Sequence, residues 1–143
     1  MTQSDFEYLM KLEKYITEIE KIGKTGTISA FSRQTDDIFL IDTDRTSKIE
    51  LSKFKIQSRY ERTKRPLIRI DIDSPPHLNP DGTKTSRNHI HIFKEEFDDF
   101  PNLPWAYDLS QFFSASEYDF TSVWEWFCNY SNIKVDFQGE LAI

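Results

Sequence analysis

The chain has 143 residues and a formal net charge of −6, and 15% of its residues are aromatic. This length suits one domain with its own core, so we expect a single domain over residues 1–143. No apolar run reaches the roughly 18 residues that cross a bilayer, and acids stand near the start where a signal peptide has its apolar core. These features predict a cytoplasmic protein with no membrane partner. The acidic total excludes proteins that hold nucleic acid through an overall basic surface.

The first segment has the pattern of an amphipathic helix. Apolar residues from Phe6 to Ile19 recur at spacings of three and four, and Ser4 with Glu7 has the form of a capping box. We expect this helix to end near Gly23.

From Thr27 onward the apolar period changes to two. Alternation of this kind is typical of strands, and it predicts five of them, at 27–33, 36–44, 53–62, 66–73 and 88–93. Breaker residues separate these runs, including Thr46–Ser47 and the long stretch 74–88.

Two further elements complete the predicted fold. A second helix is expected at about 119–130, and a last short strand at 133–137. The fold class is therefore α+β, with an antiparallel β-meander of about five to six strands and the N-terminal and C-terminal helices packed on one face.

Strand alternation sorts the residues of such a sheet into two faces. The isoleucines of 66–73 and 88–93 share one face, which we expect to contact the helices. The opposite, uncovered face then gathers the polar residues Arg59, Arg69, Asp71, His89 and His91.

All three histidines of the chain lie in the segment from His77 to Glu96. The turn signal Asn79-Pro80-Asp81-Gly82 begins soon after His77, and loop 74–88 leads directly into His89 and His91. A folded loop would bring the three imidazoles together. A plain structural role, with the rings on a polar surface or stacked across strands, is the alternative.

The histidine segment matches two known motifs in part, one from metal-binding proteins and one from nucleotide hydrolases. His89, His91 and Glu95 form H-x-H-x3-E, the first half of the cupin metal motif, but no histidine follows His91 to complete it, so His77 would have to substitute. The histidine-triad nucleotide hydrolases need a third histidine where this chain has Phe93.

A third pattern needs neither metal nor cofactor. Attack of the RNA 2′-OH on the adjacent phosphate requires a general base, a general acid and a cation, which His and Arg supply near neutral pH. We expect His91 as base or acid with His77 or His89 as its partner, Arg59 and Arg69 as charge stabilisers, and Asp71 as the group that orients a histidine. The basic strip 53–69 and the adjoining loops would bind RNA, through Lys55, Gln57, Asn79, Arg87 and Trp105.

Three motifs of the chain match those of a known family: PPHLNPDG, then HIHIFKEEFDD, then WAYDL. Over residues 54–110 the chain resembles an uncharacterised family of small bacterial and prophage proteins with the core P-P-H-x-N-P-D-G, H-x-H-I-[YF]-[KR]-E and W-A-x-x-L. In this chain Glu96 and Asn102–Pro104 stand where related proteins have glycines and a shorter connection. The resemblance implies a toxin of a toxin–antitoxin pair or a factor in the contest between phage and host defence.

A non-enzymatic role is the alternative to RNA cleavage. An acidic surface with exposed Trp105, Tyr107 and Phe112 would fit the basic groove of a host defence nuclease. The partner is therefore RNA or a protein, either an antitoxin or a host defence protein. An exposed strand edge would also allow a homodimer.

The single cysteine, Cys128, lies among aromatic residues. This setting predicts a buried, inert thiol.

Overall fold

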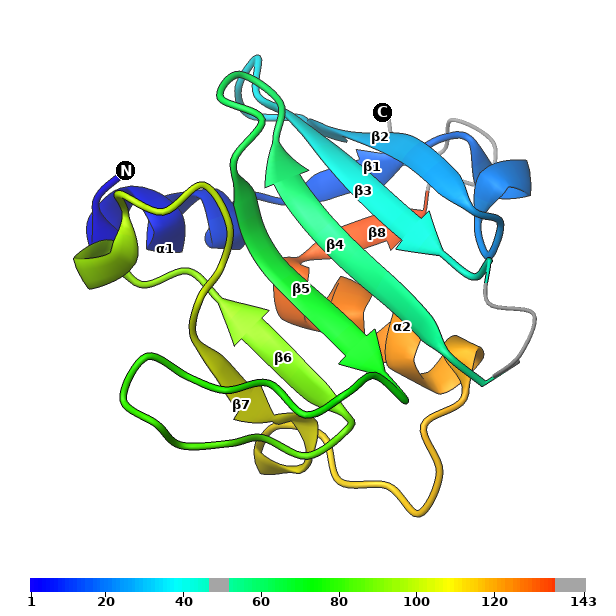
Figure 1. Ribbon diagram of the computed structural model, residues 1–143. Helices are drawn as coiled ribbons and strands as arrows, with labels where there is room; N and C mark the ends of the chain where they lie inside the picture. Colours follow the sequence, from blue (N-terminus) through cyan, green and yellow to red (C-terminus); the bar gives the residue numbers. More distant parts are fainter. Residues whose placement is uncertain (47–51, 136–143) are drawn as a thin grey trace.

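The computed structural model describes residues 1–46 and 52–135, which fold into a single eight-stranded sheet with two α-helices (Figure 1). The sheet order is β7-β6-β5-β4-β3-β2-β1-β8, and every pair is antiparallel except the parallel pair of β1 with β8. The strands are β1 (Lys14–Ile16), β2 (Gly26–Ser32), β3 (Ile38–Asp44), β4 (Phe54–Tyr60), β5 (Pro66–Ile72), β6 (His89–Ile92), β7 (Ala106–Asp108) and β8 (Ile133–Val135). The helices are α1 (Gln3–Lys11) and α2 (Phe120–Ser131), with short 3-10 turns η1 (Ile19–Lys21), η2 (Glu95–Phe97) and η3 (Leu109–Gln111).

The five consecutive strands predicted from alternation are confirmed as β2 to β6, and they form the expected meander. The expected strand number of five to six is too low, because β1 and β7 were missed and each has only three residues. The predicted last strand is present as β8, while its expected end at 136–137 lies outside the described residues, as does Ser47 of the predicted turn.

The N-terminal helix is shorter than expected. It is capped by Thr2 and Asp5, in place of Ser4 and Glu7, and it ends at Lys11. The next residues leave the helix because Lys14–Ile16 pairs with both β2 and β8. This pairing between distant segments outweighs the helical spacing of Ile16.

One hydrophobic core lies between the sheet and the helices. The isoleucine face supplies fully buried side chains from three neighbouring strands, with Ile56, Ile70 and Ile90 paired across β4, β5 and β6. Phe6 and Leu9 of α1 and the α2 residues Val123, Trp124 and Phe127 belong to the same core. Cys128 is buried as predicted, and burial raises the pKa of its thiol to about 12.

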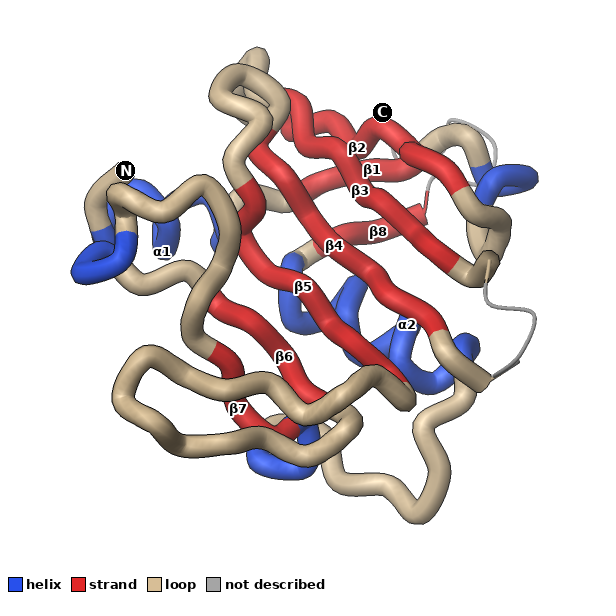
Figure 2. The backbone as a smooth tube through the Cα atoms, viewed as in Figure 1, coloured by secondary structure: helices blue, strands red, loops and turns tan. Residues whose placement is uncertain are grey.

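At the β6 and β7 end of the sheet, the other face is covered by the long loop 74–88, which joins β5 to β6 (Figure 2). This loop lies on one side of the sheet and α2 lies on the opposite side. The expectation of an uncovered polar face is wrong at this end of the sheet. No helix among residues 1–46 and 52–135 is long and apolar enough to span a membrane.

A buried cation joins the two helices. Lys14 is 2% exposed, and its Nζ donates to the carbonyl oxygens of Met10, Leu12 and Ser131 at 3.2, 2.9 and 2.7 Å. These carbonyls lie at or just beyond the C-terminal ends of α1 and α2, where the helix dipole favours a positive charge. Burial nevertheless lowers the pKa of Lys14 to about 7.

The lowered pKa of Lys14 predicts a stability that rises with pH. Between pH 7 and 10.5 the unfolded chain binds the proton more strongly than the folded chain does, so deprotonation favours folding in this window. Between pH 7 and pH 9 we expect the unfolding free energy of the wild-type protein to rise by roughly 1–2 kcal/mol more than that of Lys14→Met, as measured by urea unfolding. Equal pH dependence in both proteins would contradict this reading.

Candidate functional site

The sheet register places the predicted histidines directly beside Arg69 and Asp71. On β6 His89 pairs with Asp71 of β5, and His91 pairs with Arg69. All four side chains occupy the positions that alternate with the isoleucines, so they share the face opposite the hydrophobic core. The register agrees with the expected sharing of one face, while the roles of these residues in a site stay predictions.

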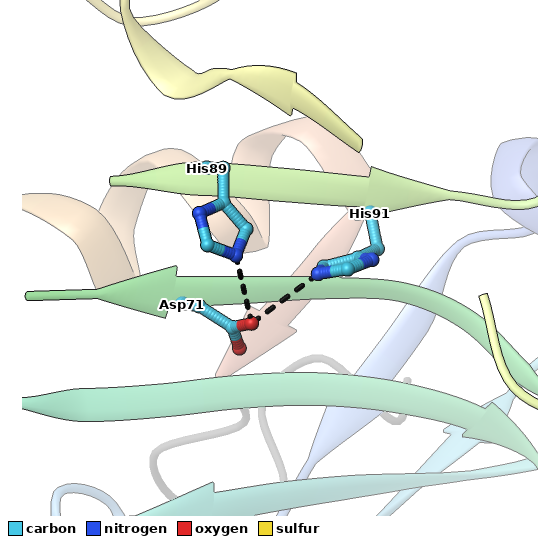
Figure 3. A group of neighbouring side chains, drawn as sticks. All are labelled: Asp71, His89 and His91. Carbon is cyan, nitrogen blue, oxygen red and sulfur yellow. Dashed lines mark hydrogen bonds and ion pairs between the residues drawn. The ribbon is translucent and has the colours of Figure 1, made fainter. Parts of the chain in front are cut away.

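The carboxylate of Asp71 lies at the centre of this group (Figure 3). Its Oδ2 is 3.1 Å from the Nε2 of His89 and 3.3 Å from the Nε2 of His91. The three residues are almost fully buried, with Asp71 3%, His89 2% and His91 1% exposed. We call Asp71, His89 and His91 the carboxylate–histidine cluster.

Arg69 closes one side of the cluster. Its Nε donates to Asp71 Oδ1 at 3.1 Å, and its Nη2 lies 3.0 Å from the Nε2 of His91. Since a guanidinium can only donate, that Nε2 must accept, which makes His91 a neutral ring with its proton on Nδ1. Burial lowers the pKa of His91, which agrees with this assignment. The contact between His91 and Asp71 is therefore not a hydrogen bond in this state.

The hydrogen bonds of His89 differ from those of His91. Both nitrogens of His89 face acceptors, because Nδ1 lies 2.9 Å from the carbonyl oxygen of Ser86 and Nε2 lies 3.1 Å from Asp71 Oδ2. Burial on its own would raise the pKa of Asp71, but the hydrogen bond from His89 and the Arg69 charge outweigh it and hold this pKa well below its usual range.

His77 joins the other two imidazoles, as the sequence predicted. Its ring centroid lies 4.6 Å from that of His91 and 6.0 Å from that of His89. Its Nε2 lies 2.7 Å from the carbonyl oxygen of Pro104, and the Nδ1 of His91 lies 2.7 Å from that of Leu103. His89 and His91 thus bind the main chain of two irregular segments to β6, and His77 binds these two segments to each other.

The turn residue Asn79 has a structural role that the sequence did not indicate. Its side-chain amide donates to the carbonyl oxygen of Ala106 at 2.9 Å and accepts from the Ala106 N–H at 2.8 Å. Asn79 is 6% exposed, so this pair of bonds is buried. The side chain of Asn79 thus bonds the N–H and the carbonyl oxygen of Ala106, which point away from β6 on the edge strand β7. These two bonds explain why loop 74–88 lies along this edge.

Several predicted site residues do not join the cluster. Arg59 forms a two-pronged ion pair with Asp42, at 2.6 and 2.9 Å, on strands separated from β6 by β5, so its expected role beside the histidines is not supported by the geometry. Gln57 also donates to Asp42, at 3.0 Å. Their partner, Asp42, was not among the predicted residues.

The remaining predicted binding residues lie around the loop. Lys55 is 42% exposed, and its Nζ is 4.0 Å from Asp71 Oδ1. Arg87 donates to the carbonyl oxygen of Asp73, and Trp105 stacks on Phe97. Glu95, the carboxylate of the cupin-like pattern, accepts from the N–H of Gln3 at 2.7 Å and is not part of the cluster.

The buried amide of Asn79 gives a direct test of how loop 74–88 is held. In Asn79→Asp the donor to Ala106 is lost and a carboxylate faces a carbonyl oxygen. We expect this variant to lose about 1–3 kcal/mol of unfolding free energy in urea. Asn102→Asp, the same change at an exposed position, is the control and should cost little. Equal stability of the two variants would show that the edge bond contributes nothing.

Comparisons with known proteins identify a family but no activity. No curated protein and no solved structure matches the chain. A family model matches residues 1–133, which include both helices, strands β1 to β7, the first residue of β8 and the carboxylate–histidine cluster. The chain therefore belongs to the family of unknown function DUF6978.

Proposed function

We propose that this protein acts by binding, as a non-enzymatic inhibitor that covers the basic, nucleic-acid-binding surface of a partner protein. The observation that supports the proposal is an unbroken series of aromatic contacts at the β7 edge of the molecule. We call these residues the aromatic belt: Phe97, Phe100, Trp105, Tyr107, Phe112, Trp126 and Tyr130.

Each ring of the belt contacts at least one other ring of the belt. Trp105 stacks on Phe97 with centroids 6.1 Å apart, Tyr107 and Phe112 are 5.6 Å apart, and Trp126 stacks on Tyr130 at 4.8 Å. Segments distant in sequence thus form one patch, from η2 through β7 to α2. Aromatic residues dominate binding energy at protein interfaces because they bury a large area with few rotatable bonds.

The belt is accessible to a partner. Phe100 is 52% exposed, and Phe112 and Tyr130 are each 38% exposed. A contiguous apolar surface of this kind on a folded protein is a feature of interaction sites. His89 and His91, by contrast, are too buried to meet a large partner.

Acidic residues next to the belt define the chemistry of the partner. Glu95, Glu96 and Asp99 are exposed around Phe97 and Phe100, and Glu125 is exposed beside Trp126. Exposed carboxylates and aromatic faces both attract Lys and Arg, the second through cation–π contacts. Lys94, whose Nζ lies 4.2 Å from the Trp105 ring centroid, already makes such a contact within the chain. A basic groove is the surface that fits this combination.

The double variant Phe112→Ser with Tyr130→Ser tests the belt, because both side chains are exposed and their loss leaves the core intact. Host lysate is passed over immobilised protein, and the affinity of any captured basic protein is then measured by calorimetry. We expect binding to weaken about 30-fold or more in the double variant. A DNA or RNA oligonucleotide should compete with wild-type for the partner.

Phe31→Ser is the matched control, since Phe31 is 42% exposed and lies on β2, outside the belt. It should bind as wild-type does. The proposal fails if both variants retain the same partners, or if the captured protein binds oligonucleotide and this chain at the same time.

Metal-independent cleavage of RNA stays a prediction, as the second candidate. One group of side chains combines the neutral ring of His91, the ring of His89 with an acceptor at each nitrogen, and the positive charge of Arg69. Together they supply a base, an acid and a cation. RNA would have to approach beside Arg69, whose side chain is 28% exposed, because the two imidazoles themselves are covered.

Cleavage of RNA in EDTA is the measurement for this candidate. We expect His91→Ala to slow cleavage by about 10²–10⁴-fold, the usual contribution of one general acid or base. Arg59→Ala should leave the rate unchanged, because Arg59 pairs with Asp42. No cleavage by wild-type protein, or equal cleavage by His91→Ala, would exclude the enzyme.

A further inference from the structure

The carboxylate–histidine cluster has the spacing of a metal-binding site. One ligand atom from each of Asp71, His89 and His91 lies within 4.8 Å of the other two. Oδ2 of Asp71 is 3.1 and 3.3 Å from the two Nε2 atoms. Ligands bound at about 2.1 Å to one ion lie about 3.0–3.4 Å apart for bond angles between a right angle and a tetrahedral one.

The second nitrogen of each imidazole is held as metal-binding histidines require. Nδ1 of His89 lies 2.9 Å from the Ser86 carbonyl oxygen, and Nδ1 of His91 lies 2.7 Å from the Leu103 carbonyl oxygen. Donation from Nδ1 to a carbonyl leaves the lone pair of the neutral ring on Nε2 and fixes the ring orientation. Both Nε2 atoms face the Asp71 carboxylate (Figure 3), and a bound ion would take the place of the Nε2 proton that His89 donates to Asp71.

The ligands come from rigid elements. His89 and His91 are alternate residues of β6, and Asp71 is the cross-strand partner of His89 on β5. The three side chains are buried and their ligand atoms already lie within 4.8 Å of one another, so the site needs no rearrangement of the main chain. His77 adds a further imidazole at 4.6 Å between centroids from His91.

Arg69 competes with an ion for this position. Its Nη2 lies 3.0 Å from the Nε2 of His91 and 3.4 Å from Asp71 Oδ2. A bound ion would replace these hydrogen bonds, and the partly exposed Arg69 side chain can turn toward solvent. Removal of Arg69 should therefore favour metal binding, whereas a purely structural ion-pair network would gain nothing from it.

We infer that Asp71, His89 and His91 form a site for one divalent transition-metal ion. Two imidazole nitrogens and one carboxylate oxygen suit zinc and its neighbours in the first transition row, in preference to magnesium or calcium, which prefer oxygen ligands. The site is independent of the aromatic belt. It also uses the nitrogens that metal-free cleavage of RNA would need, so an occupied site and that second candidate exclude each other.

Titration of the metal-stripped full chain with Zn²⁺ and Co²⁺ tests the inference. By calorimetry we expect one ion per chain, and by visible absorption a Co²⁺ spectrum of nitrogen and oxygen ligands. Asp71→Asn should weaken binding by about 100-fold or more, because it removes a directly bound charged ligand. Glu95→Gln, the matched change at the carboxylate that lies outside the cluster, should bind as wild-type does, and Arg69→Met should bind at least as tightly.

A measurement on wild-type protein covers the case in which variants of the cluster fail to fold. Nitrogen-15 NMR should show zinc shifting the Nε2 resonances of His89 and His91. Absence of saturable binding, or binding that survives Asp71→Asn and leaves both Nε2 resonances in place, would overturn the inference. So would weaker binding by a folded Arg69→Met, since the competition argument would then be wrong.

Discussion

The buried carboxylate of Asp71 is the constraint on which the second face of the sheet depends. A charge removed from water is costly unless hydrogen bonds and opposite charge surround it. Here Arg69 and His89 provide both, and His89 in turn binds the main chain of loop 74–88. The same carboxylate thus links strand pairing to loop docking, and loss of any one partner leaves the others buried without compensation.

The two faces of the sheet are stabilised by different physics. Isoleucines and α2 make one face an ordinary hydrophobic core, which tolerates exchange of similar side chains. On the other face imidazoles and an amide bind main-chain oxygens of Pro104, Leu103 and Ala106. Hydrogen bonds depend on direction and distance far more than apolar contacts do, so this face specifies one arrangement of the loops. Loops held in one arrangement in this way would suit a binding site as well as a structural support.

Strand alternation was enough to predict much of the candidate site. The period of two placed His89, His91, Arg69 and Asp71 on one face, because neighbours on a strand must point to opposite sides. The cover over this face could not be predicted, since it depends on carbonyl oxygens of Ser86 and Leu103. Every residue carries such an oxygen, so no pattern of residue types reveals which ones will be used.

The N-terminal segment shows where a local apolar pattern fails to predict the structure. Its apolar spacing was helical as far as Ile19, and only residues up to Lys11 formed the helix. Strand β1 gains partners on both sides from β2 and β8, one of them more than a hundred residues away along the chain. A local pattern carries no information about such a partner. For Arg59 the missing information was again its partner, Asp42 on the neighbouring strand.

The amide of Asn79 has a consequence for how the molecule meets copies of itself. Edge strands invite another chain to add a strand, and natural sheets usually protect them. Here the protection of β7 at Ala106 comes from one side chain of a loop, and it is present only once that loop has docked. A newly made chain therefore exposes the unpaired main-chain groups of this edge strand for as long as loop 74–88 is undocked. A homodimer built by strand addition at β7 would have to displace Asn79 from Ala106.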